Sequence, residues 1–193
     1  NTRLVGSEMC IRDRFEVAGR DHRQASAGDL GFIVGPRLNA AGRLDDMSIG
    51  IECLLAESSA SARGFAEKLH QLNRERRDIE QSMQQDALAQ LESIDLEGDD
   101  SLFAMTLYDS AWHQGVIGIL ASRIRERVRR PTLVFADAEE GMLKGSGRSI
   151  ANLHLRDVLD QVATRHPGLL TKFGGHAMAA GLSLKKDDLD HFK

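Results

Sequence analysis

The spacing of hydrophobic residues changes along the chain and divides it into regions of different structure. Between about residues 58 and 93, apolar residues recur at steps of three, four or seven, and residues 73–91 contain neither Gly nor Pro. The polar positions between them carry both charge signs, which is typical of a solvated helix. This pattern predicts one long helix of roughly 50 Å at 1.5 Å per residue. Its expected buried positions are Phe65, Leu69, Leu72, Ile79, Met83 and Ala87.

The pattern changes after the sequence DLEGDD at residues 95–100. Short apolar runs now alternate with helical patterns, an order that indicates an α/β domain with a mixed sheet. We therefore expect a connecting helix at residues 58–97 and an α/β domain at residues 98–193. Strands are predicted at residues 101–109, 132–137, 142–149 and 177–185, helices at residues 115–130 and 153–166, and the start of a further helix at residues 187–193.

The region before the long helix, residues 15–57, has weaker signals. Four glycines and one proline interrupt residues 28–46, so we expect a loop-rich stretch there. Ser48 is the expected N-cap of a short helix that follows it.

Residues 1–14 fit no structural pattern. The peptide VGSEMCIRD at residues 5–13 back-translates to GTG-GGC-TCG-GAG-ATG-TGT-ATA-AGA-GAC, a nucleotide string that resembles the transposon adapter of sequencing libraries. We interpret residues 1–14 as adapter-derived and exclude them from the fold. Resequencing the locus tests this interpretation, which fails if the genome encodes the segment contiguously.

Composition and charge narrow the functional classes. The 193 residues are 41% hydrophobic and 28% charged, an ordinary globular composition, and no apolar run is long enough to cross a bilayer. Because the net charge is −4, a nucleic-acid role requires a local basic patch. Cys10 and Cys53 lie far apart without a Cys/His cluster, so we expect a cytoplasmic protein with no disulfide framework and no zinc site.

The stretch PRLNAAGRL at residues 36–44 is a first candidate anion site. Arg37, Asn39 and Arg43 stand in a backbone that small residues keep bare, and each of the two guanidinium groups matches two oxygens of a phosphate or carboxylate. The alternative is a polar turn with solvent-exposed arginines.

The stretch LKGSGRS at residues 143–149 is a second candidate. Its glycines let the main chain curl around an anion, and charge and hydroxyl donors are added by Lys144, Ser146, Arg148 and Ser149. The spacing is not that of a Walker loop. The alternative is a glycine-kinked edge strand.

Trp112 and His113 precede the helix that is predicted to begin near Gly115. Free N–H groups at a helix N-terminus attract anions, and a tryptophan can stack on a base. For Trp112 we favour packing in the core, since a single large aromatic residue in a small domain usually packs. For His113 the alternative is capping of the helix.

The stretch KFGGHAMAAGLSL at residues 172–184 places His176 directly after Gly174 and Gly175 and before a run of small residues. The two glycines allow a tight turn or the close approach of a ligand. A lone histidine is more often structural than catalytic. The glycine pair and the small neighbours shift the interpretation toward a ligand contact.

Taken in order, GPRLNAAGRLDD, WHQGVIGILASRI, LKGSGRS and KFGGHAMAAGLSL resemble the RecJ family of single-strand-specific DNA exonucleases, in the DHH phosphoesterase superfamily. The GGHxxAAG element taken singly marks only the DHH-associated C-terminal domain. The resemblance implies that residues 15–57 are the C-terminal remnant of a preceding α/β metal domain and expose apolar surface. It also implies that residues 98–193 are a C-terminally truncated substrate-binding domain.

The resemblance implies a 5′→3′ exonuclease that hydrolyses phosphodiester bonds of single-stranded DNA in recombination and repair with two Mn²⁺ or Mg²⁺ ions. The metal ligands of the family lie upstream of Gly28, and RDHR at residues 20–23 is not the DHH motif. We therefore expect no metal ligand and no catalytic residue in this chain, and no activity of this chain by itself. The implied partners are single-stranded DNA, a single-strand-binding protein and a helicase.

The family motifs assign a phosphate-binding role to eight residues. Two of them would face the phosphates near the metals, and the others would hold the nucleotide from the opposite wall or let the backbone approach it. They are Asn39, Arg43, His113, Ser146, Arg148, Gly174, Gly175 and His176. Two other functions stay open: a DHH-type oligoribonuclease or cyclic-dinucleotide phosphodiesterase, and a non-catalytic nucleic-acid-binding module.

Overall fold

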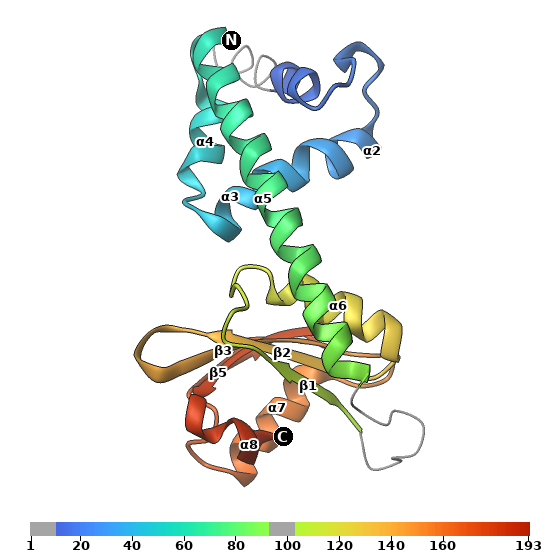
Figure 1. The fold of residues 1–193 in the computed structure, drawn as a ribbon, viewed down its shortest axis with the longest axis vertical. Coiled ribbons are helices and arrows are strands. Elements are labelled where there is room, and N and C mark those ends of the chain that lie inside the picture. Colours follow the sequence, from blue (N-terminus) through green and yellow to red (C-terminus); the bar gives the residue numbers. More distant parts are fainter. Residues whose placement is uncertain (1–10, 93–102) are drawn as a thin grey trace. The chain divides into compact units, whose positions relative to one another are not determined.

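The computed structural model describes residues 11–92 and 103–193. The chain forms two compact units, a first unit of residues 1–78 and a second unit of residues 79–193. Helix α5 (Ser59–Glu92) contributes to both of them, as Figure 1 shows.

Helix α5 confirms the long helix predicted from the apolar spacing. Ser58 Oγ accepts a hydrogen bond from the Ser61 backbone N–H at 3.2 Å and so serves a free donor in the first turn. Of the six predicted core positions, Leu69, Leu72, Met83 and Ala87 are buried, and the other two are half-buried.

The first unit is helical where a loop-rich stretch was expected at residues 28–46, so that prediction is wrong. Ser26 and Asp29 form a capping box that starts the first helical turns, and Pro36 lies in a first helical turn, where no N–H donor is needed. The elements are a helical segment at residues 11–17, η1 (His22–Gln24), α2 (Ala27–Asp29), the π-helical turn η2 (Leu30–Val34), α3 (Gly35–Leu44) and α4 (Ser48–Leu55).

Helix α4 starts differently from the prediction. Ser48 is its first residue and makes no cap, and the Oδ1 atom of Asp46 accepts the Ser48 N–H at 2.8 Å. Around this helix the core is built of small and medium side chains, namely Ala40, Ala41, Ile49, Cys53, Leu69 and Leu72. Cys53 is disulfide-bonded, which differs from the expectation of a chain without disulfides, because separation in sequence does not limit which cysteines meet in a fold.

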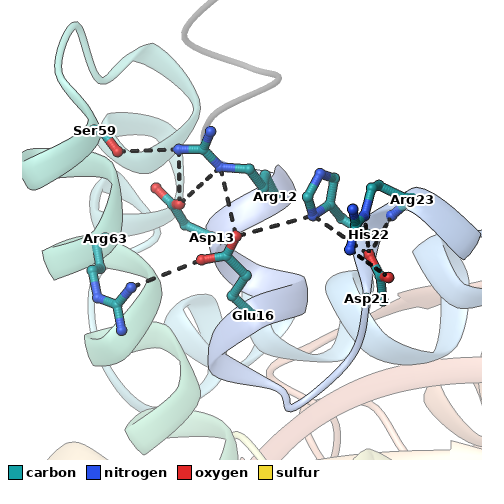
Figure 2. A network of polar contacts seen from close by, with 8 residues as sticks. All are labelled: Arg12, Asp13, Glu16, Asp21, His22, Arg23, Ser59 and Arg63. Carbon is teal, nitrogen blue, oxygen red and sulfur yellow. Dashed lines mark hydrogen bonds and ion pairs between the residues drawn. The ribbon is translucent and has the colours of Figure 1, made fainter.

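A polar network holds the segment at residues 11–17 against the start of α5 (Figure 2). Arg12 donates to Ser59 Oγ at 3.2 Å and lies 3.4 Å from Asp13. Glu16 lies 3.8 Å from both Arg12 and Arg63. Arg12 and Asp13 fall in the segment that we interpret as adapter-derived, and that interpretation stays a prediction.

The second unit contains the predicted mixed α/β domain. Its five-stranded sheet has the order β1-β2-β3-β5-β4, with β1 parallel to β2 and the other neighbours antiparallel. The strands are β1 (Met105–Tyr108), β2 (Thr132–Asp137), β3 (Met142–Arg148), β4 (Lys172–Gly175) and β5 (Ala179–Lys185). The helices are α6 (Ile117–Val128), α7 (Leu155–Arg165) and α8 (Leu189–Phe192), with 3₁₀ turns η3 (Glu139–Gly141) and η4 (Lys186–Asp188).

Helices cover both faces of this sheet (Figure 1). On one face α7 and α8 pack against a core cluster that includes Leu133, Phe135, Leu143, Leu182 and Leu184. Helix α6 packs on the opposite face against β2 and β3. Trp112, just before α6, is 4% exposed, which confirms the packed interpretation.

The end of the sheet differs from the prediction. Residues 172–175 form strand β4, which the two glycines had concealed, and β5 begins at Ala179 rather than at residue 177. His176 therefore lies in the β4–β5 turn and not at the start of a strand; its backbone N–H donates to the Ala179 carbonyl at 2.8 Å. The predicted strand at residues 101–109 is observed from Met105 to Tyr108, and its first two residues lie outside the described part.

Candidate functional site

Strand β3 directs Ser146 and Arg148 to the sheet face on which α6 packs. Three hydrogen bonds fix the Arg148 guanidinium: it donates to Ser122 Oγ at 3.0 Å, to Ser146 Oγ at 3.0 Å and to the Gly147 carbonyl at 2.8 Å. Helix α6 passes close above, since a Cβ on Gly118 would lie 3.0 Å from Arg148 Nη2. Ser146 and Arg148, both predicted from the sequence as anion-binding residues, are thus in direct contact, and their binding role stays a prediction.

The glycines of this sheet have two different roles. At Gly145 and Gly147 a Cβ would lie 2.4 Å from the Phe135 ring and 2.7 Å from Leu155, respectively. Gly175 has a φ of 145°, and its Cβ would lie 2.4 Å from the Ala179 carbonyl oxygen. These three glycines are therefore required by packing or by the turn.

Gly174 and Gly181 are different, because packing does not require them to be glycine. An added Cβ meets no atom within 4 Å at Gly174 and only the Gly145 carbonyl, at 3.9 Å, at Gly181. The two residues pair with each other across β4 and β5, and Ser146 of β3 pairs with Gly181 on the other side. Together they form a bare strip of backbone beside Ser146.

A hollow of about 650 Å³ lies over this part of the sheet. Gly174 and Gly181 contribute to its floor, Lys144 and Lys172 contribute two ammonium groups, and Ser183 contributes a hydroxyl group. Gln114 and Glu139 also line it. The hollow is open to solvent, and its cationic side chains outnumber its one carboxylate.

The two predicted histidines have different surroundings. His113 Nδ1 accepts the Gly115 backbone N–H at 3.1 Å, so this ring supports the turn that leads into α6. His176 is exposed at the tip of the β4–β5 hairpin, next to the glycine pair.

In the first unit, Asn39 and Arg43 lie on one exposed face of α3, one turn apart. Arg37 of the same stretch is only 7% exposed, and its guanidinium donates to the Ile33 carbonyl at 2.6 Å and to His70 Nδ1 at 3.2 Å. Burial and the neighbouring Arg77 charge lower the pKa of Arg37. Arg37 is thus a structural residue of α3.

Lys172, Ser183 and Gly181 did not stand out in the sequence as binding residues. Their common position follows from the register in which Lys144 and Lys172 both pair with Ser183. The available signal was the glycine of AAGLSL, Gly181, which follows the GGH element by a few residues.

Within residues 11–92 and 103–193, no group of three or more His, Cys, Asp or Glu side chains is arranged to hold a metal ion. The described helices also include none that is long and apolar enough to cross a membrane. The side chains of the site offer guanidinium, ammonium and hydroxyl donors, which suit an anion.

Comparison with known proteins shows which families this chain is similar to. Residues 99–193 match the DHHA1 domain family. The single-stranded-DNA-specific exonuclease RecJ of Dickeya dadantii is 56% identical over 183 residues, which are 95% of this chain and 32% of that protein. The Escherichia coli protein of the same name is 52% identical over the same shares of the two chains. The crystal structure of RecJ with Mg²⁺ from Thermus thermophilus has a TM-score of 0.80 and 30% identity, and the match covers 99% of this chain and 28% of that one.

The second unit therefore carries a DHHA1 domain. Over 95% of its length the chain is similar to RecJ proteins, and it spans about a third of the length of these relatives.

Proposed function

We propose that this chain is the substrate-binding part of a 5′→3′ exonuclease that hydrolyses single-stranded DNA in recombination and repair. The observation that carries the proposal is the Ser146–Arg148 pair beside a strip of backbone that carries no side chains. A guanidinium fixed in one orientation recognises a phosphate without a further loss of side-chain entropy. The names of the relatives supply the substrate class.

In this proposal Ser146, Arg148 and His176 contact phosphate groups, and Gly174 allows the strand to approach the sheet. Asn39 and Arg43 contribute an exposed polar pair in the first unit, and His113 and Gly175 support the geometry of the loops.

The proposal assigns no metal ion to the described residues of this chain. Solved relatives are described as complexes with Mg²⁺ and Mn²⁺. The described residues of this chain do not fit such ions, so we assign them binding and not bond cleavage. A single-strand-binding protein and a helicase remain proposed partners.

The proposal is tested by the binding of a fluorescently labelled oligodeoxythymidylate to this chain, measured by anisotropy. We expect Arg148→Ala to weaken binding about tenfold, because a hydrogen bond to a charged group is removed. Arg156→Ala removes the same charge from an exposed position of α7 and should leave the affinity unchanged. Equal binding by the Arg148→Ala variant and the wild type would overturn the assignment.

A second measurement addresses the reaction. The full-length protein should degrade the labelled strand in the presence of Mn²⁺, and this chain should not. Nuclease activity of the purified chain that a chelator abolishes would contradict the assignment of binding only. Preferential cleavage of short oligoribonucleotides by the full-length protein would favour the oligoribonuclease alternative.

A further inference from the structure

The hollow on the sheet extends beyond the residues assigned above. Ser146, Gly181 and Gly174 form one row across β3, β5 and β4, and Lys144, Ser183 and Lys172 form the next row. The two rows are about 6.6 Å apart, because two residues along a strand advance by that length. Lys144 and Lys172 line the hollow together with Gly174 and Gly181.

The floor of this hollow has no side chains at Gly174 and Gly181, and neither packing nor backbone conformation requires glycine there. Neither Gly174 nor Gly181 is among the glycines with positive φ. A Cβ would stand in open space on Gly174, and on Gly181 it would make an ordinary contact with the Gly145 carbonyl oxygen at 3.9 Å. Glycine in a strand interior weakens the strand, since it has high backbone entropy and no side chain to pack. A ligand that lies directly on the backbone would account for both glycines.

The rim of the hollow supplies positive charge at matched positions. Lys144 and Lys172 flank the same residue of β5, Ser183, from opposite sides. Both lysines are exposed, and among the ion pairs and hydrogen bonds of the described residues neither ammonium group has a partner. Lysine binds a phosphate as a flexible point charge and reads no base sequence.

We propose that this hollow binds a second phosphate of the same single strand, next to the one assigned to Ser146 and Arg148. Lys144 and Lys172 hold that phosphate from two sides. The sugar and base between the two phosphates lie on the strip formed by Gly174 and Gly181. This inference rests on the proposed function and extends it from one phosphate contact to a track of two.

The charge contribution is measured with Lys144→Ala and Lys172→Ala in this chain, with the labelled oligodeoxythymidylate as probe. Each variant should bind about threefold more weakly at low salt, and the slope of log affinity against log salt should fall by about 0.7 for each phosphate that the variant no longer neutralises. Lys68→Ala is the matched control, because Lys68 is an exposed lysine of α5 whose charge lies outside the hollow.

The floor is tested separately with Gly181→Val. Valine is favourable in a strand and its Cβ meets only the Gly145 carbonyl oxygen, at 3.9 Å, so thermal stability should stay equal or rise. The isopropyl group occupies the floor, however, and should weaken oligonucleotide binding about fivefold by displacing the strand from the lysines. A loss of binding without a loss of stability distinguishes a ligand surface from a packing defect.

The outcomes separate this inference from the proposed function. If Arg148→Ala weakens binding while Lys144→Ala, Lys172→Ala and Gly181→Val bind like the wild type, the second subsite is overturned and the proposed function stands. If the wild-type chain does not bind the oligonucleotide, both are overturned. If the lysine variants weaken binding and Lys68→Ala does not, the two-phosphate track is supported.

Discussion

The two units bury different kinds of side chain. The second unit buries its large apolar side chains on a sheet: Leu120, Phe135, Leu143 and Leu184 are each 0% exposed. The first unit has a core rich in alanine, and it leaves Phe32 83% exposed and Leu55 65% exposed.

The first unit instead places charged groups inside. Arg14 is 0% exposed, which lowers its pKa to about 10, and Arg37 is bound to His70 and Ile33. Buried charges stabilise a fold less than apolar packing does, and they require well-placed partners. The second unit is therefore stabilised mainly by its apolar core, whereas the first combines a smaller apolar core with specific polar contacts.

The largest effect should come from the core of the second unit. Phe135→Ala removes a fully buried ring that also contacts Phe192 edge to face, and we expect it to lower the free energy of unfolding by about 3–5 kcal/mol. Urea unfolding followed by the fluorescence of the single tryptophan, Trp112, measures the loss.

Phe32→Ala is the matched control in the first unit. Because that ring is 83% exposed, its removal should change the free energy of unfolding by less than about 0.5 kcal/mol. If Phe135→Ala and Phe32→Ala lowered the free energy of unfolding by similar amounts, the proposed difference between the two units would be contradicted.

The two units also differ in how well their helices and strands could be predicted from the sequence. Helix α5 and the strands β2 and β5 were predictable. The apolar residues of α5 and β5 recur at the spacing of one buried face, and β2 is a continuous apolar run that is buried along almost its whole length. Residues 28–46 were not predictable, since their glycines and Pro36 are tolerated in helices whose tertiary contacts override local propensity. Strand β4 was hidden for a similar reason, because Gly174 and Gly175 have the composition of a turn.

The candidate site was predictable only in part. Ser146 and Arg148 lie two residues apart on one strand, so the local pattern already places them on one face. Lys172 meets the same hollow as Lys144 only through the register of β3, β5 and β4. No pattern within a single strand contains that register.

An intermediate effect is expected from Arg37→Met in the first unit. The variant keeps much of the side-chain volume but leaves the Ile33 carbonyl and His70 Nδ1 without their donor. Removing the partner of a buried polar group costs about 1–3 kcal/mol. Urea unfolding followed by far-UV circular dichroism at pH 7.5 should show this loss.

The dependence of the free energy of unfolding on pH tests the same contact from the side of His70. Burial, and then the charges of Arg37, Arg74 and Arg77, lower the pKa of His70 below its ordinary value of 6.5. The unfolded chain thus binds the proton more readily, so stability is present above pH 6.5 and is lost as the pH falls through the folded pKa. His70→Gln should flatten this dependence and His154→Gln should not; an unchanged slope in His70→Gln would contradict it.

The smallest effect should come from the exposed ion pairs of Arg63, of which Figure 2 draws the pair with Glu16. Arg63 lies 3.8 Å from Glu16 and 3.1 Å from Glu67, and its side chain is 57% exposed. Water and salt screen such pairs, so Arg63→Ala should lower the free energy of unfolding by less than about 1 kcal/mol, and by still less at high salt. Unfolding followed by circular dichroism at low and high salt measures both values.

This last measurement tests what holds the first unit together. If its polar contacts stabilise it only where they are buried, the loss in Arg63→Ala stays well below that in Arg37→Met. A loss of more than about 2 kcal/mol would exceed what an exposed pair supplies. The exposed ion pairs would then stabilise the first unit as much as apolar packing stabilises the second. The two units would differ in whether polar or apolar contacts stabilise them, and buried contacts would no longer be required.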